Sequence, residues 1–103
     1  SSGACALSLS IAINEALGIG LSKIEAARIA HVAEVECKTG LGTVIAETYG
    51  GFEVRIRAGA PGVGEIEQIP VGNDYSVVCL NFGPVSTKKV LNEMNSRIRI
   101  NEA

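Results

Sequence analysis

The chain has 103 residues, a formal net charge of −2, 47% hydrophobic residues and only 4% aromatic ones. This length supports one small core, which has to be built from aliphatic side chains and alanine. The lack of a basic run excludes a nucleic-acid footprint, and no apolar run approaches the roughly 20 residues of a membrane span.

The first predicted helix spans residues 2–17. Its apolar residues recur at steps of three and four, the spacing of one helix face, and Ser1 or Ser2 can cap its start. The chain begins at this helix start without a methionine. We interpret the chain as a segment of a longer protein; the alternative is that Ser-Ser-Gly is left over from an expression tag.

A second predicted helix leads into a glycine turn. It begins at Ser22, which forms a capping box with Glu25, and it ends near Glu36. The turn at residues 39–42 contains two glycines, which let the backbone fold sharply and approach a ligand closely. A short third helix is predicted at residues 43–48.

The period of the apolar residues changes from helical to alternating after the double glycine at 50–51. The elements predicted from there on are a half-buried strand at 52–57, a short edge strand at 65–71, a buried strand at 75–82, a helix from 86 or 87 to about 95, and a tail at 97–103 that forms a short strand or frays. Helices followed by strands favour an α+β fold, with helices packed on an antiparallel sheet.

The three cysteines, Cys5, Cys37 and Cys79, are predicted to be reduced and buried. Their odd number and wide spacing do not fit a disulfide framework, and reduced thiols are typical of the cytoplasm. A free cysteine most often behaves as a small buried hydrophobe. We therefore expect a cytoplasmic protein whose thiols have a packing role.

Two carboxylates and the only histidine lie just before the glycine turn. Glu34 and Glu36 are two residues apart, so they point to different helix faces, and Glu34 lies on the apolar side one turn after Ala30. Glu34 is therefore the better candidate ligand for Mg²⁺; the alternative is a solvated helix face. His31 is interpreted as a buried, hydrogen-bonded side chain that orients the turn, rather than as a general base.

The start of the first helix, Ser1, Ser2 and Gly3, is the second candidate feature. A helix N-terminus attracts phosphate through its free amides and partial positive charge, and a serine hydroxyl there can ligate Mg²⁺. The alternative is an ordinary helix cap. We expect this helix start and the end of the second helix to face one phosphate-handling site.

Together these segments resemble the GHMP small-molecule kinases and, within them, the archaeal pantoate kinases. The stretch SSGACALSLSIAINEALG is similar to the end of their phosphate loop, and AHVAEVECKTGLGTVIAETYGG to their helix and second glycine turn. FEVRIRAGAPGVGEIEQIP is similar to the following strand–loop–strand, and VVCLNFGPVSTKKVL to the entry to the second domain. The resemblance implies a GHMP-kinase (ribosomal protein S5 domain 2-like) fold. Residues 1–74 would be part of the N-terminal domain, and residues 75–103 the start of the C-terminal domain.

The resemblance also implies ATP-dependent phosphorylation of a hydroxyl of pantoate, on the way to coenzyme A. Carried over by position, Ser1, Ser2 and Gly3 would hold the ATP phosphates, and Ser2 with Glu34 would bind Mg²⁺. Thr87 would approach the transferred phosphoryl group from the second domain. No nucleic-acid or membrane partner is expected, and uncovered apolar faces would favour a homo-oligomer.

Thr43 departs from the superfamily pattern. It occupies the catalytic position where most members have an aspartate that acts on the substrate hydroxyl, although some members manage without it. A threonine cannot act as a carboxylate base, a function worth about 10²–10⁴-fold in rate.

The chain also lacks the front of the phosphate loop and most of the second domain, so by itself it should bind ATP poorly. Two alternatives are a non-catalytic remnant that Thr43→Asp would activate, and a small structural α+β domain. Mevalonate-like and homoserine-like acceptors stay open beside pantoate.

Overall fold

The computed structural model describes residues 1–102. The chain divides into two compact units, the first of which is Ser1–Val71 while the second starts at Gly72. The assignment of residues 1–74 and 75–103 to two kinase domains stays a prediction. The first unit contains three helices and a two-stranded antiparallel sheet, so the predicted α+β class is confirmed.

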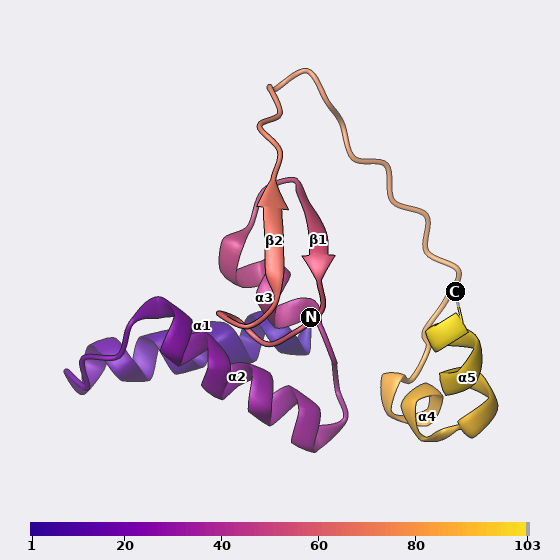
Figure 1. Ribbon diagram of the computed structural model, residues 1–103, viewed down its shortest axis with the longest axis horizontal. Coiled ribbons are helices and arrows are strands. Elements are labelled where there is room, and N and C mark those ends of the chain that lie inside the picture. The colour runs from indigo at the N-terminus through magenta and orange to yellow at the C-terminus, as the bar shows by residue number, and fades with distance from the viewer. Residues whose placement is uncertain (103) are drawn as a thin grey trace. The chain divides into compact units, whose positions relative to one another are not determined.

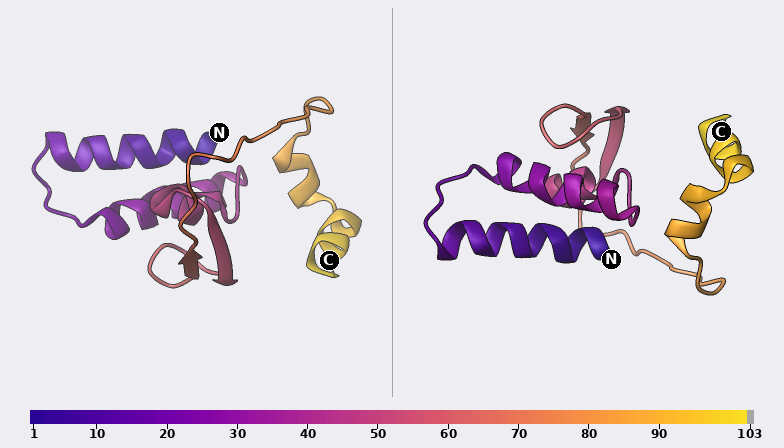
Figure 2. Two further views of the ribbon diagram at one scale, coloured as in Figure 1. Left: turned by 90° about the horizontal axis from the view of Figure 1, so that it is seen from above. Right: turned by 90° about the horizontal axis from the view of Figure 1, so that it is seen from below.

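Three helices form the core of the first unit: α1 (Ser2–Ala16), α2 (Lys23–Cys37) and α3 (Thr43–Tyr49). They confirm the helices predicted from the sequence. Figures 1 and 2 show α1 and α2 side by side, with α3 next to them. The buried residues at their contact are mostly small or β-branched, which lets the helix backbones approach closely: Leu7, Ala27, Ala30 and Val44.

Local signals define both ends of α2. Ser22 Oγ accepts a hydrogen bond from the Glu25 amide at 3.2 Å, and Glu25 Oε2 accepts one from the Ser22 amide at 2.8 Å. This is the predicted capping box, which satisfies two amides at the helix start. At the other end Lys38 adopts a left-handed conformation with φ of 55° and stops the helix. The direction of the chain into the glycine turn is thereby set.

The sheet consists of β1 (Glu53–Arg57) and β2 (Glu65–Gln68), paired antiparallel with an irregularity between Arg55 and Arg57. The strand at 52–57 was expected to be half-buried, and this expectation is wrong. Val54 and Ile56 are 45% and 56% exposed. Alternation places these side chains on one face of the sheet, but nothing in the described part of this unit covers that face.

The buried strand predicted at residues 75–82 is not present. This stretch has no regular secondary structure, and Val77, Val78 and Phe82 are more than nine-tenths exposed. A strand needs a neighbour for its backbone hydrogen bonds. The sheet found within residues 1–102 consists of β1 and β2 alone.

Two short helices end the chain, α4 (Thr87–Asn92) and α5 (Met94–Glu102). Ser86 caps α4 as expected, its Oγ accepting from the Lys89 amide at 3.4 Å. The predicted helix stops earlier than residue 95 because Glu93 adopts an extended conformation. The tail, expected as a strand or frayed end, is helical up to Glu102. No helix in the described range is long and apolar enough to cross a membrane.

The prediction of buried thiols is also wrong. Cys5, Cys37 and Cys79 are all free and exposed. Burial of a helix residue depends on whether another element covers its face, and the faces that carry Cys5 and Cys37 are not covered in this unit. Their exposure leaves no packing role for them here.

The capping box predicts a specific acid sensitivity. Hydrogen bonds from the Ser22 amide and then from its hydroxyl lower the pKa of Glu25 below its usual value of 4.5. Because the folded pKa is depressed, the stabilisation is present above the unfolded value and is lost as the pH falls through the folded value. Glu25→Gln should therefore reduce the loss of thermal stability between pH ~7 and ~3.

The measurement is a series of melting curves recorded by circular dichroism at stepped pH. Glu15→Gln, which removes an exposed carboxylate on α1 without a capping contact, is the matched control and should keep the wild-type acid dependence. A Glu25→Gln protein as acid-sensitive as the wild type would contradict the prediction.

Candidate functional site

Glu34 in the last turn of α2 is the centre of the candidate site. Its side chain is charged but only 5% exposed, so its oxygens need hydrogen-bond partners. Oε2 accepts from Ser2 Oγ at 2.9 Å, and Oε1 accepts from Thr39 Oγ1 at 2.8 Å. The expected convergence of the first helix start and the second helix end is confirmed, although Ser2 and Glu34 are 32 positions apart.

A second carboxylate, Glu47 on α3, lies beside the same helix start. Its Oε1 accepts from Ser1 Oγ at 2.6 Å, while Ser1 Oγ itself accepts from the Ala4 amide at 3.3 Å and caps α1. Glu47 was not among the residues expected from the sequence. The available signal was its place one helical turn after Thr43, which puts both residues on the same face of α3.

Two glycines allow these elements to come so close. A Cβ atom on Gly3 would lie 2.7 Å from Glu47 Oε2 and 2.8 Å from Thr43 Oγ1. A Cβ atom on Gly40 would lie 2.7 Å from Glu34 Oε2 and 3.3 Å from Thr43 Oγ1. A glycine of the turn was expected to admit a ligand, but Gly40 makes room for the carboxylate of Glu34. The side chains of Glu34, Thr43 and Glu47 therefore all lie close to the start of α1.

Ser2 and Glu34 form a hydrogen bond, and the spacing of their oxygens is also one that two neighbouring ligands of Mg²⁺ would have. Oxygens that bind octahedral Mg²⁺ at about 2.1 Å and at right angles lie about 3 Å apart. The observed separation of Ser2 Oγ and Glu34 Oε2 is 2.9 Å. No group of three or more His, Cys, Asp or Glu side chains able to hold a metal occurs within residues 1–102. An ion here would take its other ligands from water and phosphate, as Mg²⁺ commonly does.

Arg55 adds a positive charge to the site and was not expected from the sequence. It projects from β1, is exposed, and its guanidinium donates a hydrogen bond to the Gly42 carbonyl at 2.6 Å. Gly42 directly precedes Thr43 at the start of α3. The arginine thus lies next to the residue assigned to the catalytic position, where it can attract an anionic group.

The remaining predicted residues lie in different surroundings. Glu36 is exposed, in line with the expectation that one of the two carboxylates points into the site. His31 is half-buried, but its Nδ1 is buried without a hydrogen-bond partner in the described structure, so the expected hydrogen bond at this atom is not observed. Thr87 is exposed at the start of α4 in the second unit. Its approach to the phosphoryl group stays a prediction.

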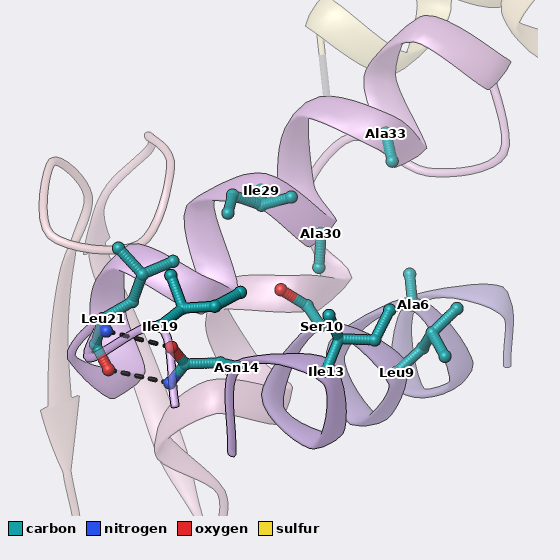
Figure 3. A pocket seen from close by; sticks show the side chains of 10 residues that line it. All are labelled: Ala6, Leu9, Ser10, Ile13, Asn14, Ile19, Leu21, Ile29, Ala30 and Ala33. Atoms are coloured by element: carbon teal, nitrogen blue, oxygen red, sulfur yellow. Dashed lines mark hydrogen bonds between the residues drawn. The ribbon is translucent and has the colours of Figure 1, made fainter. Parts of the chain in front are cut away.

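An apolar groove of about 260 Å³ between α1 and α2 is a separate feature (Figure 3). Its polar side chains are already satisfied: Ser10 Oγ donates to the Ala26 carbonyl at 2.7 Å, and the Asn14 amide pairs with the Leu21 backbone at 2.9 Å. The groove offers no charged group to a phosphate. The residues expected to bind phosphate lie at the start of α1 instead.

Comparison with known proteins gives consistent similarities. Residues 1–51 match the family model of the GHMP kinases N terminal domain. The chain is 42% identical to the pantoate kinase of Methanocaldococcus jannaschii over 90 residues, 87% of this chain and 32% of that protein. It is 42% identical to the pantoate kinase of Thermococcus kodakarensis over 86 residues, 84% of this chain and 28% of that protein.

The pantoate kinase of Methanospirillum hungatei is 32% identical over 92 residues, 89% of this chain and 30% of that protein. The chain thus spans about a third of the length of the curated relatives that it matches. No solved structure matches the chain significantly.

The close contact at Gly40 can be tested by substitution. Gly40→Ala places a methyl group against the buried Glu34 carboxylate, so we expect the free energy of unfolding to fall by about 1–3 kcal/mol, the usual range for overpacking. Gly72→Ala is the matched control, because its Cβ would meet only Asp74 Oδ2 at 3.6 Å. Urea denaturation followed by circular dichroism measures both. Equal stability of the two variants would show that the turn gives way without cost.

Proposed function

Residues 1–51 belong to the GHMP kinase N-terminal domain family, and on this basis we propose that the chain is the phosphate- and Mg²⁺-binding part of an ATP-dependent pantoate kinase. The 2.9 Å contact between Ser2 Oγ and Glu34 Oε2 is the observation that carries the proposal. The similarity to three proteins named pantoate kinase supports the choice of acceptor. The protein would act in the cytoplasm, on the route to coenzyme A.

The start of α1 would hold the phosphates. Its first backbone amides lack partners within the helix and carry a partial positive charge. Ser2 and Glu34 would hold Mg²⁺, which supplies charge neutralisation for the phosphates when it is bound. Ser1 is held by Glu47 through a 2.6 Å hydrogen bond, which fixes the orientation of the helix start. Positioning and electrostatics account for most of the rate in phosphoryl transfer.

The acceptor of the phosphoryl group would be bound at the glycine turn. Pantoate carries a carboxylate, and the site already contains the carboxylates of Glu34 and Glu47. A balancing cation is therefore needed near the acceptor, and Arg55 lies next to the turn. Its planar guanidinium can bind a carboxylate through two parallel hydrogen bonds.

The residue at position 43 favours one alternative. A threonine there leaves the first turn of α3 without a carboxylate of its own, as in a non-catalytic remnant that keeps a ligand-binding fold. In that case no residue of the chain would take the proton of the acceptor hydroxyl. The two possibilities, an active kinase and a non-catalytic remnant, therefore differ in whether a carboxylate from elsewhere in the chain reaches the acceptor hydroxyl near Thr43.

The proposal predicts acceptor-dependent ATP consumption by the protein at its natural length, assayed with pantoate, mevalonate and homoserine. Glu34→Gln removes the acidic metal ligand. Loss of a residue that only hydrogen-bonds to a metal ligand already costs about 10–100-fold, so we expect kcat/KM to fall by at least that much. Glu36→Gln, on an exposed position of the same helix, is the matched control and should be nearly silent.

Failure to phosphorylate any acceptor would overturn the kinase assignment. Equal activity of Glu34→Gln and the wild type would overturn the metal site alone. For the 103-residue chain by itself, titration with Mg·ATP in a calorimeter should give weak or no heat.

A second prediction concerns the acceptor. Arg55→Gln should raise the KM for pantoate with little change in the KM for ATP, because it removes the cation beside the glycine turn. Arg57→Gln is the matched control: Arg57 lies on the same strand, is exposed and bonds the Val63 carbonyl at 2.8 Å, away from the turn. Steady-state kinetics with each substrate varied in turn makes the comparison. If both variants keep the wild-type KM for pantoate, Arg55 does not bind the acceptor.

A further inference from the structure

One oxygen of the Glu47 carboxylate has no partner. Oε1 accepts a hydrogen bond from Ser1 Oγ at 2.6 Å, which fixes the orientation of the group. Oε2 is buried and has no hydrogen-bond partner within the described structure. A buried carboxylate oxygen without a donor costs free energy. At the edge of a binding site, such an atom points to a donor that a ligand supplies.

The unpaired oxygen lies at the catalytic position assigned to Thr43. A Cβ atom built on Gly3 would be 2.7 Å from Glu47 Oε2 and 2.8 Å from Thr43 Oγ1, so both atoms border the same point. Glu47 follows Thr43 by four residues, and helical side chains lean toward the start of their helix. The longer glutamate therefore delivers a carboxylate to the place where the threonine side chain ends.

The other groups of the site are not suited to take a proton. Both oxygens of Glu34 are already engaged, by Ser2 and by Thr39, and Glu34 is assigned to the metal. The hydroxyl of Thr43 is not a base at neutral pH. Phosphoryl transfer to a hydroxyl uses a group that orients the hydroxyl and accepts its proton. Within this site, the free oxygen of Glu47 fits that requirement.

We propose that Glu47 is the proton acceptor for the substrate hydroxyl, an inference that rests on the proposed kinase function. Glu47 Oε2 takes the hydroxyl proton as the hydroxyl oxygen bonds to the γ-phosphorus of the nucleoside triphosphate. The bond from that phosphorus to the β,γ-bridging oxygen breaks, and the nucleoside diphosphate leaves with the electron pair. Oε2 is buried, so the acceptor has to displace the exposed side chain of Thr43 that borders the same point.

Glu47→Gln in the protein at its natural length is the decisive variant. Its amide oxygen can still accept the hydrogen bond from Ser1, but the group cannot take a proton. We expect kcat to fall by about 10²–10⁴-fold. Calorimetry with Mg²⁺ and a non-hydrolysable ATP analogue should give unchanged affinity, and the melting temperature should be unchanged.

A double variant adds a rescue. Thr43→Asp in the Glu47→Gln background returns a carboxylate to the point beside Gly3 and should recover part of the lost kcat. The inference is overturned if Glu47→Gln keeps the wild-type kcat, if it loses nucleotide affinity as steeply as kcat, or if the double variant stays as slow as the single one. If the wild-type protein phosphorylates no acceptor, both the proposed function and this inference are overturned. If the wild type and Glu47→Gln are equally active, only this inference is overturned.

Discussion

The burial of the Glu34 carboxylate is the constraint on which the site depends. A charged group that is 5% exposed needs partners, and removing one partner would leave an uncompensated charge in the interior. The Ser2 and Thr39 hydroxyls supply these partners, and Gly40 leaves the space for the carboxylate. The start of α1, the last turn of α2 and the glycine turn are therefore held together by one side chain.

Local patterns predict this part of the fold well because local forces form it. The capping box determines where α2 begins, and the helical period places Glu34 on the apolar side. The contact between Ser2 and Glu34 spans 32 positions, so the helical spacing of apolar residues does not predict it. It was expected because both segments carry groups suited to phosphate or Mg²⁺, and the family resemblance strengthened that expectation; the geometry now gives it a physical cause.

Predictions of burial did less well, for a physical reason. Alternation in residues 52–57 states which side chains share a face of the sheet, but burial requires a second layer on that face. Residues 75–82 are apolar but have no strand to pair with in the described structure. The sequence did not predict Glu47, because the family pattern singles out position 43, whereas a helix can bring a carboxylate to that point from one turn further along.

Under the proposed function, the charges at the start of α1 bear on how a nucleotide would bind there. A helix N-terminus contributes about half a positive charge, whereas Glu34 and Glu47 bring two carboxylates to the same place. Arg55 beside the glycine turn offsets part of this negative charge, and in the proposed site a cation bound with the phosphates would offset more of it. Ser2 and Glu34 would hold Mg²⁺, and the ion would supply positive charge next to the phosphates. The acidic residues around this helix start are in keeping with the proposed binding of ATP as its magnesium complex.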